Sequence, residues 1–132
     1  MKNILIIDDN RDDIEFYSDL INQIDDNYKV YTAIDFLEGI SVFENYNIDC
    51  TFLDYKLPEM NGLMILEVLR KKNNNKAMPI IILTGENRRE IRAESARQGA
   101  LDFLVKDMNT TTPEQLDAVI KKVIKRANEL NN

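Results

Sequence analysis

The sequence has no histidine and only one cysteine, Cys50. Without histidine, the chain cannot form a Ser-His-Asp triad or the usual zinc sites, and it cannot itself carry a phosphohistidine. A single cysteine allows no disulfide within the chain, and Cys50 lies inside an apolar run, which is typical of a small core residue.

Long apolar runs are also missing. No segment approaches the length that crosses a membrane, and the apolar run before Asp8 is too short for a signal peptide. Cytoplasmic location without membrane contact is therefore the default expectation. The 132 residues contain no repeat and no Gly/Ser linker, so we expect a single domain over residues 1–132.

The net charge of −6 argues against direct nucleic-acid binding, which needs clustered basic residues. Basic residues do gather near the end of the chain, where we interpret them as the solvated, dipole-favourable end of a final helix: Lys121, Lys122, Lys125 and Arg126.

Apolar runs and helical patterns alternate five times along the chain. Residues 4–7, 50–53 and 80–83 are apolar throughout, which is typical of interior parallel strands, whereas 28–33 and 101–105 alternate and suit the sheet edges. The pattern predicts an α/β fold, a flavodoxin-like (βα)5 three-layer sandwich with a parallel five-stranded sheet in the order 2-1-3-4-5.

Helix starts are readable in two places. The first helix is expected to begin near Asn10 or Arg11, with Asp12 and Asp13 in its first turn, where the helix dipole favours anions. Thr112 is expected to cap the last helix, with Pro113 as its first residue and Gln115 closing a capping box. The fourth helix has only a weak apolar face, predicted from Ile91, Ala93, Ala96 and Ala100.

Polar residues stand at the carboxyl ends of four predicted strands. Asp8 and Asp9 follow the first strand, Asp54 the third, Thr84 the fourth and Lys106 the fifth. Carboxyl ends of parallel strands share one edge, so three carboxylates should meet there. Each close pair would repel by ~4 kcal/mol, and a hard divalent cation such as Mg²⁺ is the natural neutralising partner. A single strand-end aspartate is usually a cap or turn residue, but three strands contributing together favour a site.

These motifs give the chain its resemblance to the receiver domains of two-component response regulators. The resemblance covers Lys2 to about Asn128 and is carried by Ile7-Asp8-Asp9-Asn10, Leu53-Asp54 with Pro58 and Asn61-Gly62, Leu83-Thr84-Gly85, and Gly99-Ala100 through Lys106. It implies that Asp54 accepts a phosphoryl group from a phosphohistidine on a sensor histidine kinase or phosphotransfer protein.

The same resemblance assigns roles to the other strand-end residues. Asp8, Asp9 and Asp54 would hold Mg²⁺, with the backbone carbonyl of Lys56 as a further ligand. Thr84 would donate its hydroxyl to the phosphoryl group, and Lys106 would pair with it. These roles suit phosphoryl transfer, which depends on positioning and charge neutralisation.

The resemblance also implies a conformational switch read by a downstream protein. Thr84 would move toward the phosphate and Phe103 would turn inward, changing the surface of the fourth helix, fifth strand and fifth helix. Ordinary core packing explains Phe103 equally well. Asp107 stands where receivers commonly have proline, which leaves the geometry of the following loop open. Lys56 and Glu86 are expected to flank the phosphoryl group, and they could pair with each other.

Two other function classes stay open. A pseudo-receiver would bind partners without phosphorylation. A Mg²⁺-dependent aspartyl-phosphate phosphohydrolase of the haloacid-dehalogenase type needs a second aspartate two positions after the nucleophile, where this chain has Lys56. A flavodoxin is disfavoured because Asp8 and Asp9 would repel a bound phosphate. No enzymatic activity is expected beyond phosphorylation and dephosphorylation at Asp54.

Overall fold

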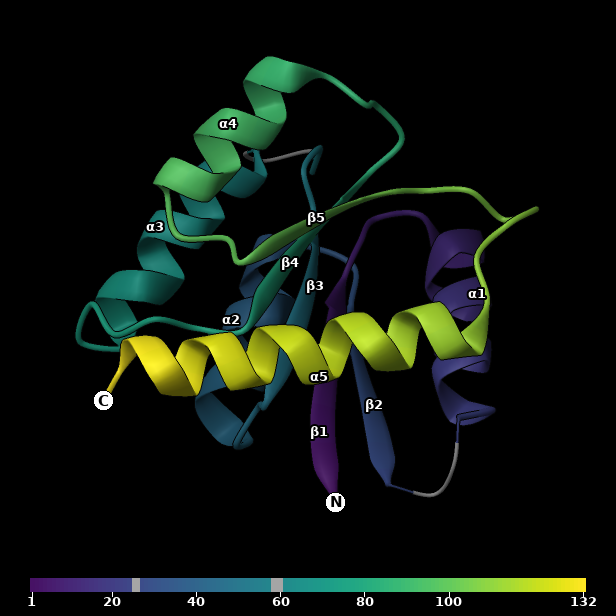
Figure 1. The fold of residues 1–132 in the computed structure, drawn as a ribbon, viewed down its shortest axis with the longest axis horizontal. Helices are drawn as coiled ribbons and strands as arrows, with labels where there is room; N and C mark the ends of the chain where they lie inside the picture. The colour runs from purple at the N-terminus through teal and green to yellow at the C-terminus, as the bar shows by residue number, and fades with distance from the viewer. Residues whose placement is uncertain (25–26, 58–60) are drawn as a thin grey trace.

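A computed structural model describes residues 1–24, 27–57 and 61–132 (Figure 1). Five strands alternate with five helices in this part of the chain: β1 (Lys2–Ile7), α1 (Arg11–Asn22), β2 (Tyr28–Ala33), α2 (Phe36–Asn45), β3 (Cys50–Asp54), α3 (Gly62–Lys72), β4 (Ile80–Thr84), α4 (Arg89–Arg97), β5 (Asp102–Val105) and α5 (Pro113–Leu130). The strands form one parallel sheet in the order β2-β1-β3-β4-β5, so the predicted fold is confirmed.

Strand burial follows the sequence pattern. β3 and β4 are buried throughout, as are the last four residues of β1, while β2 and β5 are partly exposed at the edges. The register pairs Ile7 with Leu53 and Asp54 with Leu83. The carboxyl ends of β1, β3 and β4 therefore lie side by side, which brings their following residues to one edge.

The sheet separates two hydrophobic clusters. On one face α2, α3 and α4 pack in a cluster that includes Leu5, Leu53, Ile65 and Phe103. On the other face α1 and α5 pack in a cluster that includes Tyr17 and Phe52. Cys50 is buried in this second cluster, as expected, and burial raises the pKa of its thiol. Among the described helices, none has both the length and the apolar composition required to cross a bilayer.

The predicted helix starts are confirmed. The Asn10 side chain caps α1 by accepting hydrogen bonds from the backbone N–H groups of Asp12 (2.9 Å) and Asp13 (3.1 Å). At the start of α5, Thr112 and Gln115 form the reciprocal capping box, with Pro113 at the first helical position.

The predicted apolar face of α4 is wrong in part. Ala93 and Ala96 are exposed, whereas Ile91 and, beyond the end of the helix, Ala100 are buried as predicted. Ser95 is the other buried residue of the helix. Positions four apart lie on one face, and α4 is too short to present a longer stripe to the sheet. Ser95 satisfies its buried hydroxyl by donating to the Ile91 carbonyl at 2.6 Å. Two side chains of α4 are buried, which agrees with the weak apolar face expected from the sequence.

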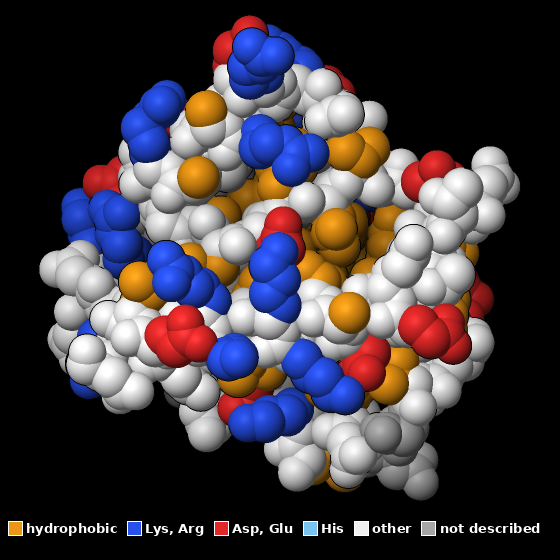
Figure 2. Space-filling model, in the orientation of Figure 1, with side chains coloured by type: hydrophobic (Ala, Val, Ile, Leu, Met, Phe, Trp, Pro, Cys, Tyr) orange, Lys and Arg blue, Asp and Glu red, His pale blue; other side chains and the backbone are white. Residues whose placement is uncertain are grey.

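The molecular face formed by α4, β5 and α5 carries many basic side chains. Lysine and arginine gather there around a shallow apolar hollow between α4 and α5 (Figure 2). The basic residues near the end of α5 are exposed, which agrees with their interpretation as a solvated surface. Three of them form ion pairs: Lys121 with Asp117 at 2.9 Å, Lys122 with Asp102 at 3.2 Å, and Arg126 with Glu129 at 3.9 Å.

Candidate functional site

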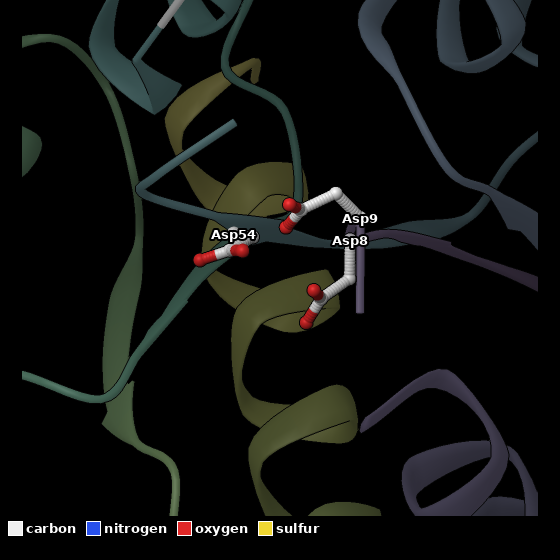
Figure 3. A group of neighbouring side chains, drawn as sticks. All are labelled: Asp8, Asp9 and Asp54. Carbon is white, nitrogen blue, oxygen red and sulfur yellow. The ribbon is translucent and has the colours of Figure 1, made fainter. Parts of the chain in front are cut away.

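Three aspartates meet at the carboxyl edge of the sheet. Asp8 and Asp9 directly follow β1, and Asp54 ends the neighbouring strand β3. One carboxylate oxygen from each residue lies within 4.8 Å of the other two (Figure 3). Asp8 and Asp54 are buried, whereas Asp9 is exposed. The convergence expected from the strand ends is therefore present.

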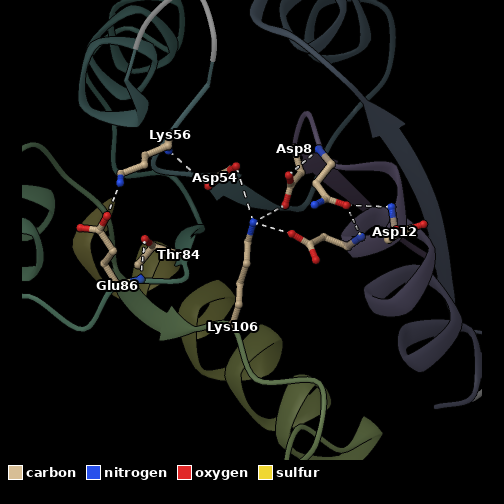
Figure 4. Close-up of polar contacts among 9 residues, drawn as sticks. Asp8, Asp12, Asp54, Lys56, Thr84, Glu86 and Lys106 are labelled. Carbon is tan, nitrogen blue, oxygen red and sulfur yellow. Dashed lines mark hydrogen bonds and ion pairs between the residues drawn. The ribbon is translucent and has the colours of Figure 1, made fainter.

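Lys106 reaches this cluster from the end of β5. Its Nζ lies 2.8 Å from Asp8 Oδ2 and 3.6 Å from Asp54 Oδ2 (Figure 4). It also donates a hydrogen bond to Asp13 Oδ2 at 2.8 Å. Asp13 was not expected at the site, because a first-turn aspartate already has a local explanation in the helix dipole.

The pKa values of Asp54 and Lys106 are both raised, for different reasons. Burial, followed by the charge of Asp8, raises the pKa of Asp54 to about 7 in the metal-free protein, although Lys106 opposes this. Burial alone would lower the pKa of Lys106, but its contacts with Asp13, Asp8 and Asp54 outweigh burial and raise it. Lys106 is therefore a permanent cation, and Asp54 is charged most readily when further positive charge is present.

The β1–α1 turn fixes the acidic side chains. Asp8 Oδ1 accepts a hydrogen bond from the Asn10 backbone N–H at 2.9 Å, and Asn10 in turn caps the helix that carries Asp13. One carboxylate oxygen of Asp8 thus holds the turn. The other, Oδ2, is buried and accepts no hydrogen bond from the described residues, although the Lys106 ammonium lies beside it.

Thr84 is placed beside the acids by β4. It is buried, its carbonyl accepts the backbone N–H of Lys106 at 2.7 Å, and its hydroxyl oxygen accepts the backbone N–H of Glu86 at 3.2 Å. Asp54, Thr84 and Lys106 line one open hollow of about 490 Å³. The hollow gives a phosphoryl-sized group access to all three.

Lys56 and Glu86 lie at the same hollow and form an ion pair with each other. The hydrogen bond from Lys56 is the main cause that lowers the pKa of Glu86, and Arg88 lies 3.4 Å from the same carboxylate. The backbone N–H of Lys56 donates to Asp54 Oδ1 at 3.2 Å. The pairing left open by the sequence is therefore present.

Phe103 is buried on the α4 side of the sheet, in the same cluster as Ile91. The Arg92 guanidinium lies 4.5 Å from the centre of its ring, within the range of a cation–π contact. Arg92 also donates to the Asn87 side chain at 3.3 Å. Core packing of Phe103 is thus observed, and Arg92 links its ring to the loop that follows Thr84.

The loop after Lys106 is closed by Asp107. The Asp107 carboxylate accepts the backbone N–H of Asn109 at 2.9 Å. Its carbonyl accepts the backbone N–H and the hydroxyl of Thr111 at 3.1 and 2.6 Å. Hydrogen bonds, chiefly from Thr110, lower the pKa of Asp107. Asp107 therefore organises this loop in place of proline. The other proline of the resemblance, Pro58, lies outside the described residues.

The donor set fits a magnesium ion. Asp8, Asp9 and Asp54 offer only oxygen atoms, which a hard divalent cation prefers, and Asp8 Oδ2 accepts no hydrogen bond from the described residues, although Lys106 lies 2.8 Å from it. A divalent charge would also relieve the repulsion among the three carboxylates.

Comparison with known proteins points in one direction. Residues 4–121 match the family model described as the response regulator receiver domain. The chain is 34% identical over 116 residues to the cyclic di-GMP phosphodiesterase response regulator RpfG of Xanthomonas campestris pv. campestris, covering 88% of this chain and 30% of that protein. It is 30% identical over 126 residues to the response regulator ArlR of Staphylococcus aureus, covering 96% of this chain and 54% of ArlR. The chain thus spans about half or less of the length of these relatives.

Solved structures of similar length share the whole fold. A response regulator receiver domain protein from Clostridium thermocellum superposes with a TM-score of 0.82 at 30% identity, covering 98% of this chain and 99% of the other. A CheY-like receiver domain protein from Methanospirillum hungatei gives a TM-score of 0.82 at 27% identity and covers 98% of both chains.

Proposed function

Because this chain belongs to the family of response regulator receiver domains, we propose that Asp54 accepts a phosphoryl group from a phosphohistidine on a partner protein. The observation that carries the proposal is the position of Asp54. Its buried carboxylate lies at the open hollow, beside Asp8 and Asp9 and 3.6 Å from the Lys106 ammonium.

In the proposed transfer, a carboxylate oxygen of Asp54 attacks the phosphorus. The phosphorus–nitrogen bond breaks as the phosphorus–oxygen bond forms, and the electron pair stays on the imidazole, which takes up a proton. Lys106 supplies positive charge to the phosphoryl oxygens, and Thr84 donates its hydroxyl to one of them. Mg²⁺, held by Asp8, Asp9, Asp54 and the Lys56 carbonyl, would neutralise further negative charge when bound.

The product is an acyl phosphate, which water can hydrolyse. Reversal of the modification returns Asp54 to its carboxylate, so the domain can serve as a resettable switch. Lys56 and Glu86 flank the hollow, and we propose that they influence the rate of this hydrolysis.

We further propose that the face of α4, β5 and α5 is the surface that a downstream protein reads (Figure 2). The route to it begins at Thr84, whose hydroxyl accepts the Glu86 backbone N–H. The following Asn87 contacts Arg92, and Arg92 covers the ring of Phe103. A shift of Thr84 toward the phosphoryl group would disturb these contacts, and the small buried face of α4 would lower the free-energy cost of a rearrangement.

The domain is proposed as a signalling module over residues 1–132, working in the cytoplasm without direct contact to nucleic acid or membrane. Its partners would be a sensor histidine kinase or phosphotransfer protein and a downstream target. One relative is named as a phosphodiesterase response regulator, and another, CqsS of Vibrio cholerae, as a sensor kinase/phosphatase. These named activities differ between proteins that share the matched domain, so we do not assign either of them to it. We propose no enzymatic activity beyond the turnover of its own phosphoaspartate.

The test is intact mass after incubation with Mg²⁺ and acetyl phosphate. We expect the protein to gain one phosphoryl group, and we expect Asp54→Asn to gain none. Omission of Mg²⁺ should strongly reduce the gain. An unmodified wild-type protein that also shows no amide shifts with beryllofluoride would contradict the proposal and favour a pseudo-receiver.

A further inference from the structure

Besides the acidic cluster, Lys106 contacts a residue of α1, Asp13. Resting on the proposed function, we infer that Asp13 is a positioning residue that competes with the phosphoryl group for Lys106, and thereby limits the rate at which Asp54 is phosphorylated.

The ammonium of Lys106 is directed more toward α1 than toward the acceptor. Its hydrogen bond goes to Asp13 Oδ2 at 2.8 Å, while Asp54 Oδ2 lies 3.6 Å away. Asp8 Oδ2 is also at 2.8 Å, yet it accepts no hydrogen bond from the described residues. Asp13 is therefore the best-oriented partner of the cation on which transfer depends.

The pair is sheltered and held in place. The side chains of Lys106 and Asp13 are 17% and 14% exposed, so solvent screens their attraction less than that of a surface pair. The backbone N–H of Asp13 is bound to the Asn10 side chain at 3.1 Å, and the Asn10 N–H is bound to Asp8. Asp13 is thus tied to the acidic cluster through the helix cap.

Asp13 stands apart from the three carboxylates that could jointly hold a metal. If Asp8, Asp9 and Asp54 held Mg²⁺, the negative charge of Asp13 would remain available to Lys106. An ammonium that stays paired stabilises negative charge on phosphoryl oxygens less well than an unpaired one. The same negative charge of Asp13 attracts a divalent cation to the neighbouring cluster.

These two effects have opposite signs when the charge is removed. Asp13→Asn should bind Mg²⁺ more weakly, yet at saturating Mg²⁺ it should be phosphorylated faster. A purely structural role in the first turn of α1 would produce no such combination.

The experiment measures the phosphorylation rate constant by intact mass, with phosphoramidate at saturating Mg²⁺, and Mg²⁺ affinity by calorimetry. For Asp13→Asn we expect a rate about three- to tenfold higher and a dissociation constant about two- to fivefold higher, the range of a sheltered charge pair. Asp12→Asn is the matched control, because it removes the same charge from the same helical turn. Its rate should stay within about twofold of wild type, as expected for an exposed charge.

Two further variants test whether the effect passes through Lys106. In a Lys106→Gln background, adding Asp13→Asn should leave the rate unchanged. Asp13→Glu, which restores the carboxylate, should return the rate toward wild type. Thermal unfolding of each variant shows that the comparison is made between folded proteins.

The outcomes separate the two proposals. If the wild-type protein takes no phosphoryl group, the proposed function fails and the role of Asp13 fails with it. If wild type is phosphorylated but Asp13→Asn behaves as Asp12→Asn does, only the role of Asp13 is overturned. The same conclusion follows if the Asp13→Asn effect persists in full without Lys106.

Discussion

Gly62 lies directly against the backbone of Asp54. A Cβ atom on Gly62 would come within 3.0 Å of the Asp54 carbonyl oxygen and within 3.0 Å of the Tyr55 Cα. The Gly62 N–H already donates to the Tyr55 carbonyl at 2.6 Å. The first turn of α3 can approach the end of β3 this closely only because residue 62 has no side chain.

Gly62→Ala should therefore destabilise the fold and disturb the acceptor. Both crowded partners are backbone atoms, which no change of rotamer can move, so we expect a loss of about 1–3 kcal/mol in the free energy of unfolding. The phosphorylation rate should fall as well, because the end of β3 must shift. Gly85→Ala is the control: a Cβ there meets nothing within 4 Å. Equal denaturation midpoints for the two variants would contradict this explanation.

The raised pKa of Asp54 predicts how stability depends on pH in the absence of metal. The unfolded aspartate titrates near 3.8 and the folded one at about 7. Between these values the folded protein holds a proton that the unfolded chain has lost, so stability falls as pH rises through this window. Asp54→Asn cannot ionise there and should escape the loss.

At about pH 8 in EDTA, Asp54→Asn should consequently unfold several degrees above wild type, since ~1 kcal/mol shifts the midpoint by about 3–6 °C at this size. Thermal unfolding at about pH 5 and pH 8 gives the comparison. The raised pKa of Lys106 does not enter, because that lysine stays protonated throughout the range. Parallel pH profiles for the two proteins would show that Asp54 is not the group responsible.

Magnesium should stabilise the folded protein through the three carboxylates. A ligand that binds only the folded state at about 100 times its dissociation constant adds ~2.7 kcal/mol to the free energy of unfolding. Asp9→Asn should lose at least half of this gain, because Asp9 is an exposed member of the cluster. Asp12→Asn should retain most of it. Thermal unfolding with and without Mg²⁺ measures both, and an equal gain in Asp9→Asn would exclude Asp9 as a ligand.

Replacement of Phe103 by leucine should separate packing from signalling. A hydrophobic swap in the core typically costs less than about 1.5 kcal/mol, so the domain should remain folded. It removes the aromatic ring that the Arg92 guanidinium covers. We expect the amide shifts that beryllofluoride causes in α4 to shrink by about half, while those near Asp54 persist. Unchanged shifts in α4 would leave Phe103 with a packing role alone.

The strand ends were predictable from sequence because their chemistry is local. An apolar run that ends in Asp8 or Asp54 specifies both the strand and the point at which it leaves the core. The parallel order then brings these acids together without further information. The capping roles of Thr112 and Gln115 were equally predictable, since a capping box lies within four consecutive residues.

Contacts that depend on the packing of distant elements were not predictable. Asp13 pairs with Lys106 across 93 positions of sequence. Nothing in either segment indicates that α1 and the end of β5 meet at this distance. In α4, alanine looked like a core residue, yet Ser95 is buried because its hydroxyl finds a partner within its own helix. Hydrophobicity alone could not rank these positions.

The sheet keeps the two hydrophobic clusters apart, and this separation affects how the domain can diversify. Residues such as Ile91 and Phe103 touch one set of neighbours, while Tyr17 and Leu116 touch another. Stability effects of changes in separate neighbourhoods combine additively. Over evolutionary time, the residues on one face of the sheet can therefore change to fit a new binding partner while those on the opposite face stay the same.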